Sequence, residues 1–528
     1  MAHKEMRTMM QGAVVLTVAS FIAKVLSAVY RVPFQNLVGD EGFYVYQQVY
    51  PIYGIAMTLA LSGLPQFISK IVAEQPEISE QKKVLQQLFP FVFILAGLCW
   101  AFFFFGSYEI AYMMGDLKLS SLIQVVSFTF LLVPVLSFYR GNFQGHLRMI
   151  PSAVSQVVEQ LVRVGVILVA AYSFSKFGWS VYQTGTIAMA GALLGGVVAA
   201  GILWYYDRKI RIGSSAYLTQ WRWSRNSGSL FRRLLVEGGI VSLYSAFLIL
   251  FQLVDSFVVK NTLVISGISD SAAKIDKGVY DRGQPLVQLG LVVALALSSS
   301  FLPTLTKYFV SQEQGRFLQA AKVFLRLTTT VAAAASLGLV LLLPYMNFAL
   351  FKDYHGNGVL GIYVWSIAFM AVIQAYQSIL QSRNQFVTAI VAACAGLLVK
   401  LISTSPLTYS WGTVGASLST IAGLITTLIF LMLFSKNEIN RFVIEHRFFK
   451  KLMISLATMG IVLICYQGVI ALFLGTVDHR GQALIFTLVG VLIGAGTFIY
   501  SIIKIKLFTV REWLTLPFGA KILRMKRK

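Results

Sequence analysis

Charged residues are scarce in this chain: they make up 12% of its 528 residues, whereas hydrophobic residues make up 57%. An average soluble protein has about 25% charged residues, so this sequence has too few to cover a water-exposed surface. Hydrophobic runs of about 20 residues recur from Met9 to Lys506 without a long polar stretch between them. These features exclude a soluble enzyme, a disordered chain and a separate soluble domain. They indicate a polytopic membrane protein.

Cysteine is also rare, and the signatures of common catalytic and metal sites are missing. The three cysteines, Cys99, Cys394 and Cys465, lie in apolar runs without CxxC or Cys/His spacing. A disulfide framework and a metal site are therefore not expected. The sequence has no Walker A, GxSxG or HExxH motif. We expect a protein that is not an enzyme and that carries no cofactor or metal.

Hydropathy predicts an all-α fold with about fourteen transmembrane helices. The first predicted span, 9–30, follows a short basic segment and is too long for the core of a signal peptide, so we interpret it as a retained span. An even number of spans places both termini on the same side of the membrane.

The net charge of +23 would, in a soluble protein, raise the question of nucleic-acid binding. Here most Lys and Arg residues fall in loops on one side of the predicted membrane. Cytoplasmic loops carry such an excess, so this distribution places both termini in the cytoplasm. We attribute the charge to topology and to attraction by anionic membrane lipids, and we expect no nucleic-acid partner.

A basic loop at 207–233 is the longest predicted cytoplasmic loop, and it marks the expected domain boundary. It separates an N-terminal lobe, 1–206, from a C-terminal lobe, 234–435. The remainder, 436–528, is predicted to form two more spans and a basic cytoplasmic tail. We interpret the basic loop as a linker anchored at the membrane surface.

A short internal repeat supports this division. It relates the second and eighth predicted spans, which contain similar residues in the same order: Tyr50-Pro51, Leu59-Ala60-Leu61-Ser62 and Leu64-Pro65 in one, and Gln284-Pro285, Leu295-Ala296-Leu297-Ser298 and Leu302-Pro303 in the other. Both spans cross the membrane in the same direction. The repeat therefore predicts two pseudo-symmetric six-helix lobes, related by an axis near the membrane normal, which is an architecture of transporters.

Basic residues within or beside the spans are candidate binding residues, because a charge at the bilayer centre costs on the order of 2.5 to 3.5 kcal/mol. Lys24 and Arg31 lie on one face of the first helix. Lys260 and Arg282 occupy the first helix of the second lobe and its neighbour. In a pseudo-symmetric packing these four cations would converge on one cleft, which would bind an anion such as phosphate.

Acidic residues in the spans form a second candidate group. Glu159 and Arg163 are four residues apart on one helical face, which predicts an ion pair that is either structural or functional. Asp255 lies near Lys260, either as an interfacial pair or as part of a site. Because carboxylates such as Glu159 and Asp255 can accept a coupling cation, coupling to Na⁺ or H⁺ stays open.

Three segments resemble the multidrug/oligosaccharidyl-lipid/polysaccharide exporter superfamily. They are residues 19–27 followed by Arg31, the run from Pro51 to Lys70, and Tyr280-Asp281-Arg282. Within the superfamily they are most similar to the MurJ and SpoVB-like flippases of lipid-linked oligosaccharides. The resemblance implies two six-helix lobes with alternating access, a central cavity lined by arginines, and two extra C-terminal helices that form an apolar groove for a lipid tail.

Carried over by position, the resemblance places Arg31 and Arg282 at cavity arginines of the MurJ branch. Lys24 stands where that branch has an arginine, which keeps the charge and loses the bidentate fork. The cavity arginine of the second span has no counterpart here, so the resemblance does not single out lipid II. A sodium site in some relatives uses acids in late spans, whereas 385–406 and 411–435 contain none.

Together these features predict a multi-pass, monomeric protein of the bacterial plasma membrane. It would move an undecaprenyl-pyrophosphate-linked saccharide, lipid II or a related precursor, from the inner to the outer leaflet. Its substrate-binding residues would be Arg31, Arg282, Lys24 and Lys260. Two alternatives stay open: a drug/cation antiporter of the same superfamily, whose cavity would favour acids, and a non-transporting scaffold for envelope or spore synthesis.

Overall fold

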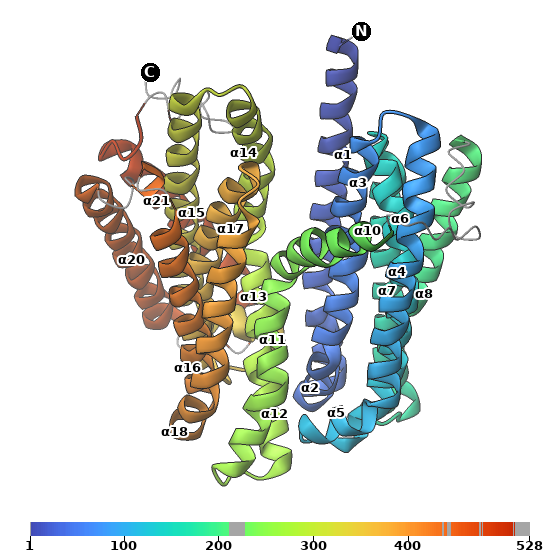
Figure 1. Cartoon of the computed structure of the whole chain (residues 1–528). Coiled ribbons are helices and arrows are strands. Elements are labelled where there is room, and N and C mark those ends of the chain that lie inside the picture. The colour runs from blue at the N-terminus through green and yellow to red at the C-terminus, as the bar shows by residue number, and fades with distance from the viewer. Residues whose placement is uncertain are drawn as a thin grey trace. The chain divides into compact units, whose positions relative to one another are not determined.

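The structure is a computed structural model, and it describes residues 2–210, 227–435, 438–440, 445–474, 477, 479–509 and 512. Within these residues all regular elements are helices, which confirms the predicted all-α class (Figure 1). The centre of the predicted linker, 211–226, lies outside the described residues. The same holds for the basic tail from residue 513 onward.

Twelve helical stretches of the described residues are long and apolar enough to cross a membrane. Two of them, Val18–Glu74 with 57 residues and Phe386–Phe434 with 49 residues, are each long enough for two crossings, since about 20 residues span the hydrocarbon core. Each contains two of the spans predicted from hydropathy. The polytopic membrane class is therefore confirmed, and the predicted number of spans agrees with the structure when these two stretches are counted twice.

A glycine interrupts each of the two long stretches. Gly39 has φ 73° and ψ −177° within α2 (Arg31–Thr58), and Gly412 has φ 58° and ψ −141° within α18 (Phe386–Phe434). Residues with a side chain rarely adopt a positive φ, and a helix cannot continue through these angles. Glycine therefore lets two predicted spans follow each other without a long loop.

The chain divides into two compact units. Unit 1 comprises Met1–Pro285 and Ala389–Gly423, and unit 2 comprises Leu286–Thr388 and Leu424–Lys528. Besides α2 and the start of α18, the elements of unit 1 are α1 (Ala2–Val29), η1 (Leu59–Gly63), α3 (Leu64–Glu74), α4 (Ile78–Phe105), α5 (Ser107–Met113), η2 (Leu117–Leu119), α6 (Ser120–Gly145), α7 (Met149–Phe177), α8 (Val181–Ile210), α10 (Ser227–Arg233), η3 (Leu234–Gly238), α11 (Gly239–Ile265) and α12 (Asp270–Asp281).

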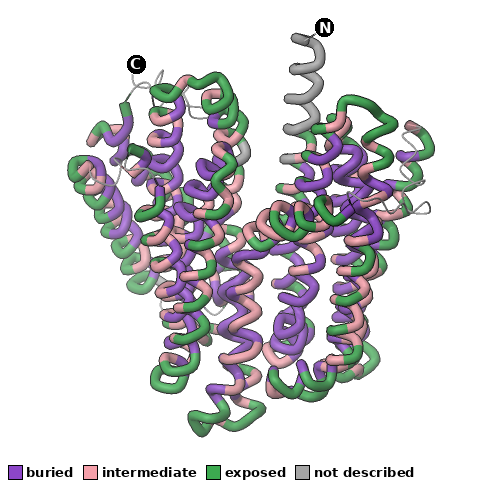
Figure 2. Tube along the Cα trace, in the orientation of Figure 1, coloured by how far each residue is buried: buried purple, intermediate pink, exposed green. Residues whose placement is uncertain are grey.

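The core of unit 1 forms where α2 and α6 meet their neighbours. α2 packs on α6, α7, α8, α11 and α12, while α7 and α8 pack along each other. Side chains such as Phe43, Ile52, Ile68 and Phe130 are buried there. Figure 2 shows α2 as a largely purple tube, so this helix is enclosed by its neighbours over most of its length. It is also the helix that carries most of the polar site described below.

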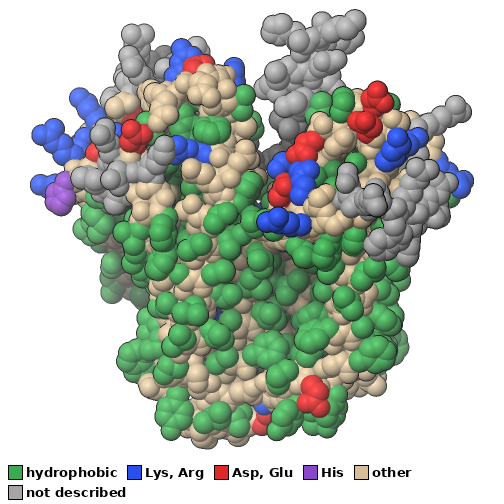
Figure 3. Space-filling view, in the orientation of Figure 1, with side chains coloured by type: hydrophobic (Ala, Val, Ile, Leu, Met, Phe, Trp, Pro, Cys, Tyr) green, Lys and Arg blue, Asp and Glu red, His purple; other side chains and the backbone are tan. Residues whose placement is uncertain are grey.

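Unit 2 is organised around α15 (Gln314–Phe351), which packs against α14 (Val292–Val310), α17 (Ser366–Ser382), α20 (His446–Leu474) and α21 (Arg480–Lys504). The short helix α16 (Asn357–Val364) precedes α17, and α13 (Gly283–Gly290) links the units in sequence. Most of the long helices are apolar enough to cross a membrane. On the face drawn in Figure 3, hydrophobic side chains cover the helices of each unit, and charged side chains gather toward helix ends.

The two units do not coincide with the two lobes predicted from the sequence. α11 and α12, which belong to the predicted lobe 234–435, pack on α2 and therefore fall within unit 1. The lobe boundaries at 206, 234 and 435 stay a prediction.

Candidate functional site

Four tyrosines surround two arginines in the core of unit 1. Tyr46, Tyr50 and Tyr53 lie on one face of α2, because residues four and seven apart share a helical face. Tyr30 precedes α2, and its hydroxyl lies 2.9 Å from that of Tyr46. We call this group, with Arg31 and Arg163, the tyrosine–arginine cluster.

Arg163 of α7 is held by hydroxyl groups of the tyrosine–arginine cluster. Its guanidinium donates hydrogen bonds to the hydroxyls of Tyr30 at 2.8 Å, Tyr46 at 3.2 Å and Tyr53 at 3.2 Å. It also donates to the side-chain oxygen of Gln160 at 2.9 Å. These acceptors are neutral, so the positive charge of Arg163 is solvated and not cancelled.

Arg31 belongs to the same cluster, but among the described residues its guanidinium lacks the hydrogen bonds that hold Arg163. Its side chain is fully buried, and the carbon of its guanidinium lies 4.5 Å from the centre of the Tyr50 ring. Among the described residues, none forms a hydrogen bond with any of its three guanidinium nitrogens. A buried cation needs compensation, and the contacts of Arg31 with the rings of Tyr50 and, at 6.0 Å, Tyr30 supply at most about 2 kcal/mol each. The Arg31 site thus has the chemistry of an incomplete anion-binding site.

Glu159 does not pair with Arg163 as the sequence spacing predicted. Its carboxylate takes Arg140 of α6 as its partner, with 2.6 Å between the nitrogen and the oxygen. Arg140 also donates to the hydroxyl of Ser155 and to the carbonyl oxygen of Ala60 in the π-helical segment η1. The prediction was wrong because α6 brings a guanidinium closer to Glu159 than its own helix does. Arg140 directly follows the apolar run 120–139, so the sequence gives it the position of a loop residue and not of a charge within a span.

Arg282 is bound by a carboxylate that the sequence did not indicate. Its guanidinium donates to both oxygens of Asp40, at 2.7 and 2.8 Å, and Gln35 donates to Asp40 as well. Asp40 follows the glycine break at Gly39, so the break presents it to the end of α12. Gly278 makes the approach possible, because a Cβ there would lie 2.2 Å from the carbonyl oxygen of Asp40.

Asp255 and Lys260 do not pair with each other, although they are neighbours in sequence. Asp255 pairs with the buried Lys400 of α18 and accepts a hydrogen bond from Tyr280 at 2.9 Å. Lys260 pairs with Asp270 and donates to the carbonyl oxygen of Gly115 at 2.6 Å. The interfacial pair, one of the two alternatives left open by the sequence, is therefore not formed. Lys400 lies within the predicted span 385–406, and this position was the signal that sequence reasoning missed.

Lys24 is not part of the tyrosine–arginine cluster. Its side chain is exposed on α1, whereas Arg31 is buried. The structure therefore brings together Arg31 and Arg163, which the sequence analysis treated separately. It ties Arg282 and Lys260 to carboxylates of their own.

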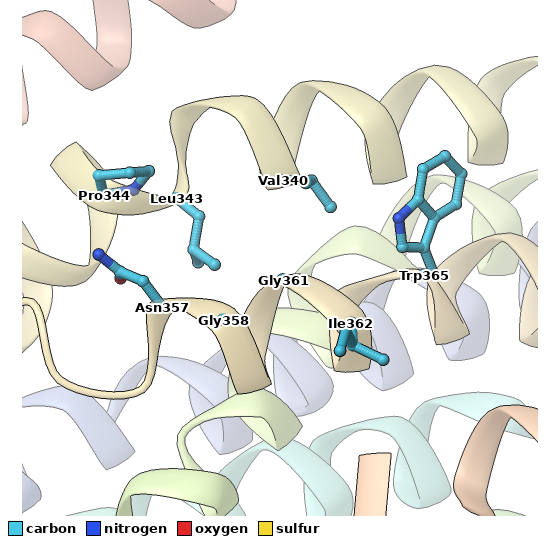
Figure 4. Close-up of a pocket in the computed structure, with 8 residues that line it drawn as sticks. All are labelled: Val340, Leu343, Pro344, Asn357, Gly358, Gly361, Ile362 and Trp365. Atoms are coloured by element: carbon cyan, nitrogen blue, oxygen red, sulfur yellow. The ribbon is translucent and has the colours of Figure 1, made fainter. Parts of the chain in front are cut away.

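Neither a metal site nor a cavity in unit 2 adds to the tyrosine–arginine cluster among the described residues. The described residues contain no group of three or more His, Cys, Asp or Glu residues able to hold a metal ion. Unit 2 contains a cavity of about 350 Å³ between Val340 and Pro344 of α15 and Gly361 of α16. Figure 4 shows the residues that line it. Its lining contains no charged side chain, so it does not provide an anion site.

Comparison with known proteins assigns the family. Residues 9–309 match the family described as "Polysaccharide biosynthesis protein". The chain belongs to this family. It is 35% identical over 525 residues to the "Uncharacterized membrane protein YabM" of Bacillus subtilis (strain 168), covering 98% of this chain and 96% of the relative. It is 26% identical over 523 residues to the "Lipid II flippase MurJ" of the same organism, covering 93% and 94%.

Solved structures of the same superfamily share the fold of this family member. A structure titled "Lipid II flippase MurJ, inward closed conformation" matches with a TM-score of 0.63 at 15% identity, covering 93% of this chain and 99% of the other. An inward-facing multidrug resistance MATE family transporter of the MOP superfamily matches with a TM-score of 0.60 at 13% identity, covering 82% and 99%. The expected exporter superfamily is thus confirmed. The relative and the structural neighbours named by an activity are a flippase and transporters, and none of them is named as an enzyme.

Proposed function

We propose that this chain moves an undecaprenyl-pyrophosphate-linked saccharide, lipid II or a related cell-wall or polysaccharide precursor, from the inner to the outer leaflet by alternating access. The observation that carries this proposal is the buried Arg31 guanidinium, which lies beside Arg163 and has no hydrogen-bond partner among the described residues. The family assignment and the flippase activity named for one relative support it.

Two guanidinium groups in one cluster suit a pyrophosphate. Arg31 can direct its nitrogens at phosphate oxygens and form paired, charge-assisted hydrogen bonds, each worth about twice a neutral one. Arg163 contributes positive potential while its tyrosine partners fix its position. Neutralising the phosphates in this way lowers the desolvation cost of carrying them across the membrane.

Arg282 binds the carboxylate of Asp40 in the way that an arginine binds a phosphate. Nε and Nη2 of Arg282 donate to the two carboxylate oxygens of Asp40, at 3.2 and 2.8 Å, which is the same two-nitrogen arrangement that a phosphate would use. We propose that substrate phosphate displaces Asp40 from Arg282 during the cycle. Exchange of one anion for another avoids leaving the Arg282 guanidinium without a partner.

The two lysines have supporting roles in this proposal. Lys24 is exposed on α1 and supplies a flexible point charge that attracts the pyrophosphate toward Arg31. Lys260 is bound to Asp270 and to the carbonyl of Gly115, so it positions the end of α11 and contributes positive potential.

In the proposed mechanism the membrane holds the lipid tail while the polar part of the substrate crosses. The saccharide crosses in water between two rocking lobes, 1–206 and 234–435, while its lipid tail stays in the bilayer. Both termini face the cytoplasm of a bacterial cell, the basic linker and tail contact anionic lipids, and the transporter works as a monomer. A cationic drug is a poor substrate, because the unpaired guanidinium of Arg31 would repel it.

Replacement of an essential flippase tests the proposal. The chain is expressed in a bacterium whose own lipid II flippase can be depleted, and growth and lipid II in the outer leaflet are measured. We expect rescue by the wild type, loss of rescue with Arg31→Ala/Arg282→Ala, and retained rescue with Arg316→Ala, whose side chain is exposed and pairs with Glu313 on its own helix turn.

Two outcomes would contradict the proposal. Normal rescue by the double variant would show that these arginines do not bind the substrate. Failure of a correctly inserted wild type would exclude lipid II, and the lipids that copurify with the protein would then show whether another lipid-linked saccharide is carried.

A further inference from the structure

Lys400 lies in a shell made of oxygen atoms. Its ammonium is fully buried and contacts the carboxylate of Asp255, the hydroxyl of Thr420 at 2.6 Å and the hydroxyl of Ser419 at 3.3 Å. These partners come from α11 and from the part of α18 that follows Gly412, whereas Lys400 itself lies before the break. Three separate segments of unit 1 therefore meet at one nitrogen atom.

The orientation of the hydroxyl groups shows that their oxygens serve as acceptors toward Lys400. Both Ser419 and Thr420 donate to the carbonyl oxygen of Ala416, at 2.8 and 3.1 Å, so both oxygens can accept from the ammonium, and Ser419 also accepts from the hydroxyl of Thr404 at 3.1 Å. Tyr280 donates to the second carboxylate oxygen of Asp255. One carboxylate and two hydroxyl oxygens are ligands typical of a hard monovalent or divalent cation.

Among the described residues Lys400 is the ion-pair partner of Asp255, and the neighbouring buried cation, Lys277, is itself paired with Asp281. α18, Phe386–Phe434, contains no Asp or Glu, so Asp255 is the sole carboxylate of this oxygen shell. A carboxylate buried without a partner is strongly unfavourable, and breaking a buried ion pair costs about 3–5 kcal/mol. Asp255 therefore needs one positive charge at this position, supplied either by the chain or by an ion from solution.

We propose that the ammonium of Lys400 takes the place of a monovalent metal cation, and that Asp255, Ser419 and Thr420 form a latent Na⁺ site which the lysine keeps filled. The wild-type protein does not bind Na⁺ there, because the ammonium occupies the position and neutralises the carboxylate. Removal of the lysine side chain opens the site. The inference concerns ion binding and stands independently of the proposed substrate. If the flippase proposal also holds, transport needs no Na⁺ at this position.

Two variants of Lys400 separate charge from space. Lys400→Ala removes both the charge and the side-chain volume, and it leaves room for Na⁺ and water beside Asp255. Lys400→Met removes the charge but retains a side chain of similar length, so it leaves little room for an ion. Asp255→Asn/Lys400→Ala removes the carboxylate as well. Of these three variants, we therefore expect only Lys400→Ala to gain Na⁺ binding.

The experiment uses the purified full chain in detergent without lipid substrate. Thermal unfolding is followed while NaCl replaces choline chloride at constant ionic strength, and binding of ²²Na⁺ is measured in parallel. We expect a saturable, Na⁺-specific rise in Tm and bound ²²Na⁺ for Lys400→Ala, and neither for the wild type, Lys400→Met or the double variant. Ethylammonium, which matches the missing end of the side chain, should compete with Na⁺ in Lys400→Ala.

Two results would show that Asp255, Ser419 and Thr420 do not form a latent Na⁺ site. Na⁺ binding by the wild type that Asp255→Asn abolishes would overturn the inference, and this measurement needs no Lys400 variant to fold. A folded Lys400→Ala protein without Na⁺ binding would also overturn it. If Lys400→Ala is not recovered, Lys400→Ser, which adds a further hydroxyl oxygen to the site, enters the same titration with the same expectation. Because lipid substrate is absent throughout, these results are distinguishable from failure of the flippase proposal.

Discussion

Arg31 and Arg163 lie against the rings of Tyr30 and Tyr50, and neither is ion-paired with a described carboxylate. Arginine keeps its proton under all ordinary conditions, so the cluster retains two positive charges. Such an arrangement is unfavourable in the absence of an anion and becomes favourable when one binds. The two buried guanidinium groups therefore lower the free energy of unfolding of the empty protein and raise its affinity for an anion.

Replacement of Arg31 should separate these two properties. We expect Arg31→Met to leave the free energy of unfolding unchanged or to raise it, because it removes a buried charge that lacks a hydrogen-bond partner. Flipping activity should fall by about 10-fold to 100-fold, which corresponds to the loss of a charged hydrogen bond worth about 1.5–3 kcal/mol. Unfolding in detergent and outer-leaflet lipid exposure measure the two effects. A strong loss of stability with unchanged activity would contradict this interpretation.

Replacement of Arg140 should have the opposite effect on stability. Arg140→Met leaves the carboxylate of Glu159 buried without its partner, so we expect destabilisation by about 3–5 kcal/mol. Glu159→Gln introduced together with Arg140→Met should recover much of this loss, since the uncompensated charge is then gone. Thermal unfolding of the two single variants and the double variant forms a complete cycle. Equal stability of Arg140→Met and wild type would show that the pair is dispensable.

The sequence identified charged residues of the site but not their partners. Arg31, Arg163 and Asp255 stand out because a charge in an apolar run is costly. Their contacts depend on neighbouring helices: Arg163 takes tyrosine hydroxyls of α2, and Asp255 takes Lys400 of α18. Sequence spacing reports only neighbours on the same helix. The tyrosines at 46, 50 and 53 were visible as a helical face, although tyrosine in a span is also common as plain packing.

At the scale of helices, glycine sets how closely α2 and η1 approach their partners in unit 1. A Cβ at Gly63 would lie 2.4 Å from the hydroxyl oxygen of Ser242 in α11, and one at Gly54 would lie 2.7 Å from Ile249. Gly278 of α12 meets the backbone of α2 in the same way. Helices in a membrane associate through close packing of small residues, because lipid provides no hydrophobic drive. These glycines therefore define the contact of α2 with α11 and α12.

Enlarging Gly278 should disturb the Asp40–Arg282 pair. Gly278→Ala places a methyl group where the Asp40 carbonyl lies, so α12 must shift away from α2. We expect destabilisation of about 1–3 kcal/mol, as for other overpacked sites. The matched control is Gly97→Ala, where nothing lies within 4 Å of the added Cβ and helix propensity favours alanine by about 1 kcal/mol. Thermal unfolding of both variants measures the contrast, and similar Tm changes would contradict the argument.

At the scale of the whole molecule, hydropathy predicted the class and the spans, because the cost of placing a residue in lipid is local and nearly additive. It did not predict the two units. α11 and α12 belong by sequence order to the second lobe, yet they pack on α2. Packing of helices depends on shape and on small residues, which hydropathy does not measure.

The topology yields a prediction for the whole chain. If both termini are cytoplasmic, a cysteine added after Lys528 should react with a membrane-impermeant maleimide only in inverted vesicles. Glu109→Cys, on the exposed surface of α5, should react only in intact cells, with the three native cysteines replaced by serine. Labelling of both positions from the same side would contradict the predicted orientation.

The π-helical segment η1 also fixes the rotational phase of the helix that contains it. A π-turn holds more residues than an α-turn, so η1 offsets the face of Tyr46, Tyr50 and Tyr53 from that of α3. Arg140 donates to the Ala60 carbonyl within it, which anchors the wider turn. About five residues of a π-turn cover nearly the same rotation as about four residues of an α-helix, so deleting one residue there would leave the tyrosine face almost unturned relative to α3. If all the residues of η1 instead became α-helical, the tyrosine face would turn by about 100° relative to α3. A change of helix type would thus redirect the aromatic face without any change of sequence.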